Sequence, residues 1–300
     1  MNKNDINIMV ILNYNDWQTV SSFVKQVQNY AIITAYIIVD NCSTDDSYEH
    51  LLLLRSNKIY VISTNNNNGY ASGNNYGIQF AEQLFNVDNI IISNPDILVT
   101  ENDIYNIITA LHSGYAMATG VIYNYDPASN HATISSNFAW REPTYKDMCC
   151  NNLLLVYKIR RYFLKKSNYF DANDLKTNKY LKVEAVPGCF FAIKDSIIKK
   201  ISYLDNETFL FGEETILGKK IKDAGFEACV VSNTKIFHEN SVSIKKSIKA
   251  KNKIWKIRMN SDLVYLNKYL KCSKFQIMFY HISFYFGCLE KQTLFLFKNR

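Results

Sequence analysis

The chain has 300 residues, of which 48% are hydrophobic and 20% charged, so it has a globular composition and can bury a sizeable core. Its seven cysteines are scattered and include no CxxC pair. This argues against a zinc site or a disulfide framework and favours reduced thiols in a cytosolic protein. The polar residues 1–5 run directly into an apolar segment, so we expect no signal peptide.

The formal net charge of +7 is unevenly distributed along the chain. Residues 241–300 contain 13 Lys/Arg and 2 Asp/Glu, a net charge of +11, which leaves residues 1–240 with a net charge of −4. A basic segment on a mildly acidic body predicts an anionic partner for that segment. Its longest uncharged stretch, Phe275 to Leu289, is too short to span a bilayer.

Apolar runs alternate with helical patterns over the first 125 residues. Short runs rich in β-branched residues predict buried strands at 8–12, 35–39, 59–62, 89–93 and near 116–124. Helices are expected after Asp16 to about 27, at about 46–54, from a polar, glycine-rich loop at 67–75 to about 85, and near 101–111. This alternation predicts an α/β fold with a doubly wound, mainly parallel sheet flanked by helices.

The alternation breaks down between residues 125 and 182, which we interpret as an irregular insertion. Its basic and aromatic segment at 157–166 is expected to be helical. Order returns at 183–193, and a helix is expected from Glu213 to about 224, closed by Gly225. Two further strands are expected at 228–231 and 234–237.

Polar side chains follow each expected strand, at the sheet edge where open α/β folds bind ligands. In Asn94-Pro95-Asp96, Pro95 should end a strand because it has no amide hydrogen. Asp96 is then placed to hold a divalent metal against a phosphate, although Asn-Pro-Asp is also an ordinary turn. Asp40 could accept a hydrogen bond from a base or a ribose hydroxyl, or belong to a turn and helix cap.

Three further residues could carry chemistry. Glu213 and Glu214 open a helix, where the dipole favours acidic residues, but one of them could also act as a general base on a hydroxyl. His238 ends a strand and could complete a metal site with Asp96, although a lone histidine is usually structural. The 67–75 loop is not GxGxxG and has no Walker lysine, so dinucleotide and P-loop interpretations are weak.

Over residues 7–245 the chain resembles family-2 glycosyltransferases of the rhamnosyltransferase-like group. Seven segments in order carry this resemblance: Ile11–Asn15, Val39–Asp45, Asn67–Gly77, Asn94–Asp96, Pro187–Phe191, Phe211–Glu214 and Phe237–Ser241. The resemblance implies a GT-A fold and an inverting enzyme that moves a hexose or rhamnose from a UDP- or dTDP-linked sugar to a glycan hydroxyl. A Mn²⁺ or Mg²⁺ cofactor and a role in bacterial surface polysaccharide synthesis are also implied.

The resemblance implies roles for individual residues. Asp40 matches the residue that reads the base, and Asp96 matches the metal ligand of the family's DxD motif, with Asn94 in place of the first Asp. Glu214 matches the second acid of a Glu-Asp pair, the expected base, and its extra methylene leaves Glu213 as the alternative. His238 matches a metal ligand or diphosphate contact of some members. The other residues expected to bind the nucleotide sugar are Asn13, Asn15, Asn41, Ser43, Gly69 and Asn75.

Residues 1–240 are expected to form the catalytic domain, with 125–182 as a candidate acceptor region. Residues 241–300 are expected to form a helical, basic and aromatic extension. Cations around Trp255 and aromatics at 275–286 fit an interfacial segment on an anionic membrane. The protein would then be peripheral on the inner face of the cell membrane, which suits a lipid-linked acceptor. Alternatively, the aromatics pack on the protein's own core or on a second subunit of a homodimer.

Two other functions stay open at this point. A sugar nucleotidyltransferase would use a similar base-binding sheet, but it begins with a glycine-rich signature containing Arg and Lys. Here the first strand runs into Asn13-Tyr14-Asn15 instead. A non-catalytic protein could bind through the basic tail, but the intact set of Asp96, Glu214 and His238 argues against this. Nucleic acid is not an expected partner.

Overall fold

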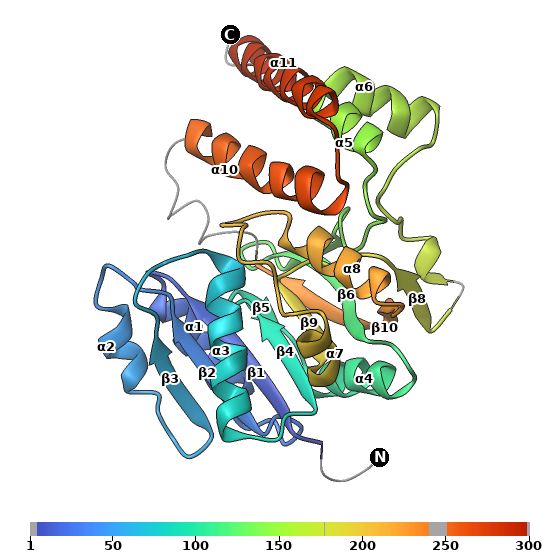
Figure 1. Ribbon diagram of the computed structural model, residues 1–300. Helices are drawn as coiled ribbons and strands as arrows, with labels where there is room; N and C mark the ends of the chain where they lie inside the picture. Colours follow the sequence, from blue (N-terminus) through green and yellow to red (C-terminus); the bar gives the residue numbers. More distant parts are fainter. Residues whose placement is uncertain (1–4, 177, 240–250, 299–300) are drawn as a thin grey trace.

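A mixed sheet runs through the middle of the molecule, with helices against it and a helical extension at one end (Figure 1). The computed structural model describes residues 5–176, 178–239 and 251–298, and side chains only for 253–293 of the last range. The strand order in the described residues is β3-β2-β1-β4-β9-β6-β10-β5, with β7 paired to β6 and β8 to β10. The expected α/β fold with a large sheet is therefore confirmed.

The first half of the sheet is parallel. Its strands are β1 (Asn7–Asn13), β2 (Ala35–Asp40), β3 (Ile59–Ser63) and β4 (Asn89–Ser93). Their apolar residues are mostly buried on both faces, which is why the sequence shows continuous apolar runs instead of alternation. The register pairs Asn13 with Asp40, so the polar residues that end β1 and β2 meet at one edge.

The second half of the sheet mixes directions. It consists of β5 (Ile97–Leu98), β6 (Met117–Asp126), β7 (His131–Ile134), β8 (Tyr180–Val183), β9 (Phe190–Lys194) and β10 (Ala228–His238). Strand β9 is antiparallel to both β4 and β6, and β10 is parallel to β6. Strand β5 pairs antiparallel with the end of β10, which brings residue 96 next to residue 238.

The helices of this part agree with most of the expected ranges. They are α1 (Trp17–Val27), α2 (Ser47–Leu52), α3 (Tyr70–Leu84), α4 (Glu101–His112), α7 (Asp195–Lys200) and α8 (Glu213–Asp223). Two expectations are wrong in detail. Residues 70–75 belong to α3 and not to a loop, and the two strands expected at 228–237 form one strand whose register shifts between Val231 and Lys235.

Residues 125–182 contain more regular structure than the sequence indicates. Besides β7 and β8, they form α5 (Tyr145–Asn152), α6 (Leu154–Lys158), a π-helical turn at Ile159–Phe163 and a 3₁₀ turn at Asp174–Lys176. A capping box between Thr144 and Asp147 begins α5. The basic segment expected to be a helix is helical through Phe163.

The C-terminal extension is helical, as expected. It comprises α10 (Lys251–Val264), a π-helical turn at Tyr265–Tyr269 and α11 (Lys274–Lys298). Leu266, Tyr280 and Phe284 form a small core of their own, onto which Tyr145 and Met148 of α5 pack. None of the helices in the described residues is both long and apolar enough to cross a membrane. The cations expected around Trp255 include Lys245, Lys246 and Lys249, which lie outside the described residues.

Candidate active site

A cavity of about 280 Å³ lies at the carboxyl ends of β1 and β4. Three residues predicted from the strand ends, Asn13, Asn41 and Asn94, line it together with Gly69. Its aromatic walls come from Tyr70, at the start of α3, and from Phe209 in the loop before α8. The cavity is therefore formed where the topology of a parallel sheet predicts a ligand site.

Asp40 lies behind this cavity and organises its neighbours. The Asn13 amide nitrogen donates to Asp40 Oδ1 at 2.8 Å and to Ser43 Oγ at 3.1 Å. Ser43 donates to Asp40 through its hydroxyl (2.6 Å) and its backbone amide (3.0 Å), and the amide of Asn15 donates to Ser43 Oγ (2.9 Å). Asp40 is 1% exposed. The Asn13 carboxamide oxygen is buried without a partner among the described residues, so it is free to accept from a ligand.

Asn41 and Gly69 join the glycine-rich loop to the loop that precedes α8. The Asn41 amide nitrogen donates to Asn67 Oδ1 (3.0 Å) and to the Gly69 carbonyl (3.2 Å). The Tyr70 amide donates to the Phe209 carbonyl (3.0 Å). Gly69 has a φ of +96°, and a Cβ there would lie 2.2 Å from the Phe209 carbonyl oxygen. Only glycine fits this close approach of two backbones.

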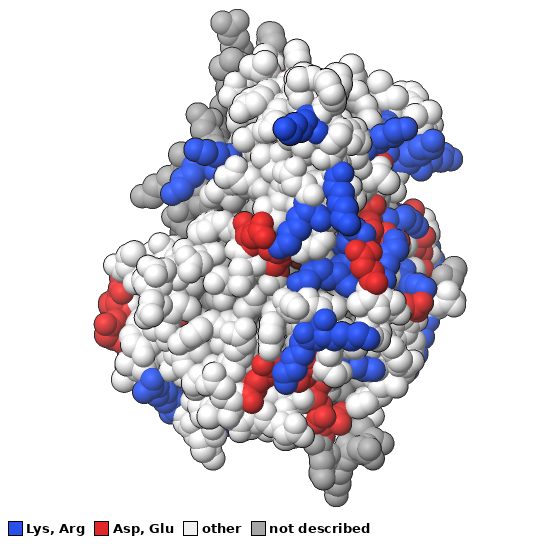
Figure 2. Space-filling view, in the orientation of Figure 1, with Lys and Arg blue, Asp and Glu red and all other residues white. Residues whose placement is uncertain are grey.

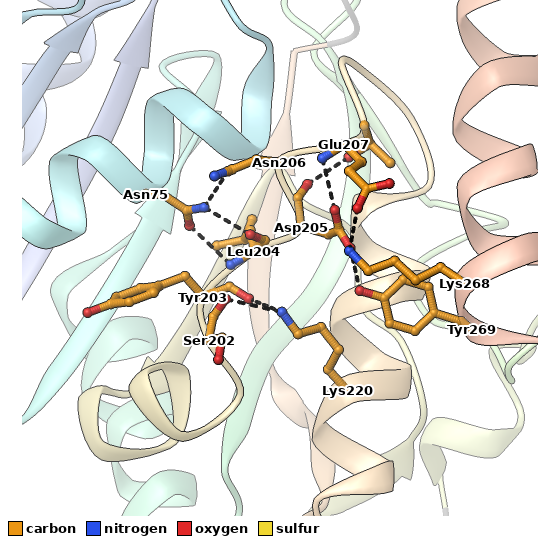
Figure 3. Close-up of polar contacts among 11 residues, drawn as sticks. Asn75, Ser202, Tyr203, Leu204, Asp205, Asn206, Glu207, Lys220, Lys268 and Tyr269 are labelled. Atoms are coloured by element: carbon orange, nitrogen blue, oxygen red, sulfur yellow. Dashed lines mark hydrogen bonds and ion pairs between the residues drawn. The ribbon is translucent and has the colours of Figure 1, made fainter.

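Asn75 is not brought to the cavity. Figure 3 shows its side chain directed at the turn that contains Leu204 and Asn206. Its amide nitrogen donates to the Leu204 carbonyl (2.9 Å) and to Asn206 Oδ1 (2.6 Å), and its oxygen accepts from the Leu204 amide (3.0 Å). The carboxamide is thus committed to fixing this turn.

The structure brings Asp96 and His238 together at the junction of β5 and β10. Asp96 Oδ2 lies 3.3 Å from His238 Nε2. Asp96 is 8% exposed, and its Oδ1 atom is buried without a hydrogen-bond partner among the described residues. Within the described ranges, no further His, Cys, Asp or Glu completes a cluster of three. A buried carboxylate oxygen without a partner beside an imidazole fits a divalent ion that takes its other ligands from substrate oxygens or water.

Glu213 and Glu214 begin α8 in different environments. Glu213 is 3% exposed, and burial, with the adjacent Glu214 adding to it, raises its pKa to about 8. Glu214 is partly exposed, and its Oε1 accepts from the Gly188 amide at 3.3 Å. Burial also raises the pKa of Glu214, while its own backbone amide and that of Gly188 oppose this increase. A Cβ on Gly188 would lie 2.8 Å from Glu214 Oε1, so glycine lets the backbone reach the carboxylate.

Residues 188 and 189 connect the two acidic sites. The Asn94 amide donates to the Cys189 carbonyl (2.8 Å), while Gly188 contacts Glu214. Burial raises the pKa of the Cys189 thiol, and Asp96 and Glu214 both add to the increase, so both carboxylates lie near this residue. One short segment therefore links the candidate metal ligand to the candidate base.

The extension contributes residues that the sequence did not single out for this site. Lys253 and Ile257 of α10 line the cavity, and Lys253 is the one Lys or Arg among its described lining residues. Ser261 of the same helix donates to the Leu210 carbonyl (2.9 Å), in the loop before α8. In the sequence Lys253 is one of several similar cations, and only the tertiary structure distinguishes it.

The same loop is held from a second point on the extension (Figure 3). Lys268 forms ion pairs with Asp205 (2.8 Å) and Glu207 (2.7 Å), and the Tyr269 hydroxyl donates to Asp205. On the other side, Lys220 of α8 donates to the Tyr203 carbonyl (2.5 Å). The extension is therefore tied to the segment that precedes the two glutamates.

Comparison with known proteins gives one family. The model of the family "Glycosyl transferase family 2" matches residues 8–201. The low-salt glycan biosynthesis hexosyltransferase Agl10 of Haloferax volcanii is 22% identical over 208 residues, which cover 69% of this chain. The match spans 58% of the length of that relative.

Two solved structures show the fold. GalNAc-T7 with UDP, GalNAc and Mn²⁺ has a TM-score of 0.62 at 14% identity, covering 79% of this chain and 44% of that chain. The mannosyltransferase PcManGT of Pyrobaculum calidifontis with GDP-Man and Mn²⁺ has a TM-score of 0.58 at 11% identity, covering 95% and 70%. With a family match over well more than half of its length, the chain belongs to glycosyltransferase family 2 and has the GT-A fold.

Proposed function

We propose that this protein is an inverting glycosyltransferase that moves a hexosyl group from a nucleotide-diphosphate sugar to a hydroxyl of a glycan acceptor. The observation that carries the proposal is that residues 188–189 bond to both candidate motifs: the Cys189 carbonyl accepts from the amide of Asn94, two residues before Asp96, and the Gly188 amide donates to the partly exposed Glu214. It is the arrangement that a displacement needs, because the leaving diphosphate and the base must flank one reacting carbon.

The donor's nucleoside is proposed to occupy the cavity beside Asn13 and Asn41, between Tyr70 and Phe209. GalNAc-T7 and PcManGT were solved with UDP and GDP-Man, which supports a nucleotide-linked donor. A UDP- or dTDP-linked sugar stays our proposal for this chain. Lys253 is proposed to contact the diphosphate, because a phosphate favours a cation and this residue is the one Lys or Arg among the described lining residues.

The reaction is proposed to be a single displacement. The acceptor oxygen attacks the anomeric carbon from the face opposite the diphosphate while Glu214 takes its proton. A carbon–oxygen bond forms, the bond to the phosphate oxygen breaks, and the electron pair leaves with the nucleoside diphosphate. Asp96 and His238 would hold a Mn²⁺ or Mg²⁺ ion, which supplies charge neutralisation on the diphosphate when bound.

The acceptor is proposed to bind beside residues of the 125–182 segment. Trp140 Nε1 donates to Thr215 Oγ1 (3.0 Å), next to Glu214, and its ring lies 6.2 Å from the ring of Tyr169. Burial raises the pKa of Tyr169, and Glu214 is among the nearby charges that add to this increase. Sugar rings have apolar faces that pack on aromatic rings, so these two side chains suit a glycan.

We also propose that the acceptor is lipid-linked and belongs to a surface polysaccharide. The relative Agl10 is named for glycan biosynthesis, which supports a glycan product. All seven cysteines are free, and free thiols persist in reducing compartments, which supports action on the cytoplasmic side.

A donor-hydrolysis screen tests this function. The full chain is incubated with UDP-, dTDP- and GDP-sugars and Mn²⁺ or Mg²⁺, and the released nucleoside diphosphate is measured. We expect release from one donor class, lost on adding EDTA and in Asp96→Asn, because a metal clamp is worth several kcal/mol in the transition state. Glu227→Gln is the control, since this exposed glutamate pairs with Lys182 away from the cavity. No release from any donor, or EDTA-sensitive activity retained in Asp96→Asn, would contradict the proposal.

A second arm of the screen tests the base. Glu214→Gln should bind the donor as the native protein does and transfer its sugar about 10²- to 10⁴-fold more slowly, the usual contribution of a general base. Glu213→Gln should affect transfer less, because the buried Glu213 is less accessible to an acceptor. The reverse order of the two effects would make Glu213 the base.

A further inference from the structure

Two neighbouring helical segments at one end of the molecule expose large apolar side chains. Among the described residues, twelve of the seventeen exposed large hydrophobic side chains lie on these segments: seven between Phe275 and Leu289, and five between Leu155 and Leu164. The seven on α11 stand at 275, 278, 279, 282, 285, 286 and 289. Side chains three and four residues apart share a helix face, so these seven form one stripe.

The opposite face of α11 is packed against the protein. Tyr280 is fully buried and donates to Asp262 Oδ2 (2.5 Å), and Ser283 accepts from the Asn152 side chain (3.2 Å). The Leu154 amide donates to Glu290 (2.6 Å), which fixes α6 beside α11. A groove of about 640 Å³ between α5 and α11 extends this apolar surface. With one face packed, α11 presents only its stripe to a partner.

The same end of the molecule is cationic. Residues 145–166 contain six Lys/Arg against one Asp/Glu. The single acid, Asp147, is already paired with Arg160. Lys158, Lys165 and Lys166 have no carboxylate within ion-pair distance among the described residues. Figure 2 shows the upper end of the molecule mostly blue and white, whereas blue and red mix around its middle.

We propose that the α11 stripe and the exposed side chains of 155–164 form one docking surface for an anionic lipid membrane. Exposed Phe, Tyr and Leu side chains flanked by Lys and Arg match the boundary between acyl chains and anionic headgroups. In a symmetric dimer formed through this surface, the two cationic surfaces would face one another, and their like charges would repel. An anionic leaflet supplies the opposite charge.

Helix α10 connects the cavity to the small core beneath the docking surface. Lys253 and Ile257 of α10 line the cavity, while Trp255 and Met259 of the same helix pack on the small core that α11 shares. The inference rests on exposed side chains and charge and not on the proposed glycosyl transfer.

Vesicle co-sedimentation of the full chain tests the docking surface. Vesicles of phosphatidylcholine alone and of phosphatidylcholine with phosphatidylglycerol are compared at low and high salt. We expect the native protein to bind the anionic vesicles, more weakly at high salt. The double variant Phe279→Ser/Phe286→Ser and the double variant Lys165→Glu/Lys166→Glu should each bind about tenfold more weakly or worse. Leu53→Ser/Leu84→Ser removes two exposed apolar side chains elsewhere and should bind like the native protein.

Three results would overturn the inference. They are no sedimentation with either vesicle, equal sedimentation with both, and an equal loss in the Leu53→Ser/Leu84→Ser control. Light scattering is run in parallel, and a dimer that Phe279→Ser/Phe286→Ser dissociates, without vesicle binding, would identify a second copy as the occupant. Thermal melting confirms that each variant is folded. Because the assay contains no donor or acceptor, its outcome is independent of the proposed transferase activity.

Discussion

Glu213 and Glu214 are adjacent in the chain but differ in what surrounds them. The buried Glu213 has an oxygen without a partner among the described residues, whereas Glu214 is partly exposed and bonded to the Gly188 amide. An ionised carboxylate without partners is costly to bury, so burial raises the pKa of Glu213 from its ordinary value to about 8. Burial raises the pKa of both acids, but Glu214 is the one that is partly exposed and bonded to a backbone amide.

The raised pKa of Glu213 predicts how stability depends on pH. Between pH 4.5, its ordinary pKa, and about 8, the folded protein keeps a proton that the unfolded chain releases. The free energy of unfolding therefore falls as pH rises through this window, by up to about 1.4 kcal/mol per pH unit. Glu213→Gln removes this titration, so its melting temperature should fall less over the same window. Glu227→Gln should melt in parallel with the native protein; a parallel curve for Glu213→Gln would contradict the assignment.

Lys253 offers a second test at the level of one residue. Lys253→Gln should weaken binding of the released nucleoside diphosphate by about tenfold, because it removes a charge-assisted contact. Its effect on binding of the corresponding nucleoside, which has no phosphate, should be small. Lys256→Gln is the matched control, on the same helix but outside the cavity. Calorimetry measures the affinity of the native protein and of both variants for each ligand, and equal losses of nucleoside and diphosphate binding in Lys253→Gln would mean that Lys253 acts by packing.

At the scale of elements, the turn at residues 204–207 connects the sheet domain to the extension through hydrogen bonds and ion pairs. Asn75 of α3 holds it from one side, and Lys268 and Tyr269 hold it from the other (Figure 3). Burial alone would raise the pKa of Asp205, but the Lys268 and Tyr269 contacts lower it below its ordinary value. The turn leads into the loop that lines the cavity and begins α8.

Asp205→Asn should therefore weaken the contacts of this turn with Lys268 and Tyr269. We expect it to lower the free energy of unfolding by about 1–3 kcal/mol, since it leaves a buried network unsatisfied. Glu207→Gln is the matched control: Glu207 contacts the same Lys268, but its side chain is 61% exposed, so its loss should cost under about 1 kcal/mol. Urea unfolding measures the free energy of unfolding of both variants. Equal losses would show that the buried Asp205 contacts stabilise the fold no more than the exposed Glu207 contact does.

The sequence predicted the elements better than their arrangement. Continuous apolar runs identified β1 to β4, and Gly225, with a φ of +81°, marks the end of α8 as expected. The start of α3 at Tyr70 was missed because residues 67–75 read as a loop, while the helix begins as soon as Gly69 has made the turn. The position of β9 between β4 and β6 depends on long-range pairing, which no local pattern encodes.

For the candidate site too, local features were predictable from the sequence and long-range ones were not. The positions of strand-end residues such as Asn13 and Asp96 were predictable because topology alone brings strand ends to one edge of the sheet, while their roles stay predictions. Asn75 was expected at the donor site, but the turn at 204–206 takes its hydrogen bonds. Lys253 was missed because its place depends on how α10 packs over the sheet, and its sequence neighbours are equally basic.

At the scale of the whole molecule, the described residues contain two hydrophobic cores. The large one lies between the sheet and its helices, and the small one joins α5, α10 and α11. The small core supports the helix that lines the cavity and the stripe proposed to meet the membrane. The extension therefore belongs to the candidate site, and deleting it would remove a wall of the cavity together with the docking surface.

The two cores give a final prediction. Leu266 is fully buried in the small core, and Leu266→Ala should cost about 2–5 kcal/mol there. Because α10 then loses its support, we expect weaker donor binding and faster proteolysis within 251–298. Ile108→Ala in α4, fully buried in the large core, is the control. It should lower the melting temperature while the folded molecules keep native donor affinity. Leu266→Ala could instead melt at a lower temperature and bind the donor with native affinity. The small core would then stabilise the chain without shaping the site, and contacts with the sheet would be enough to position Lys253.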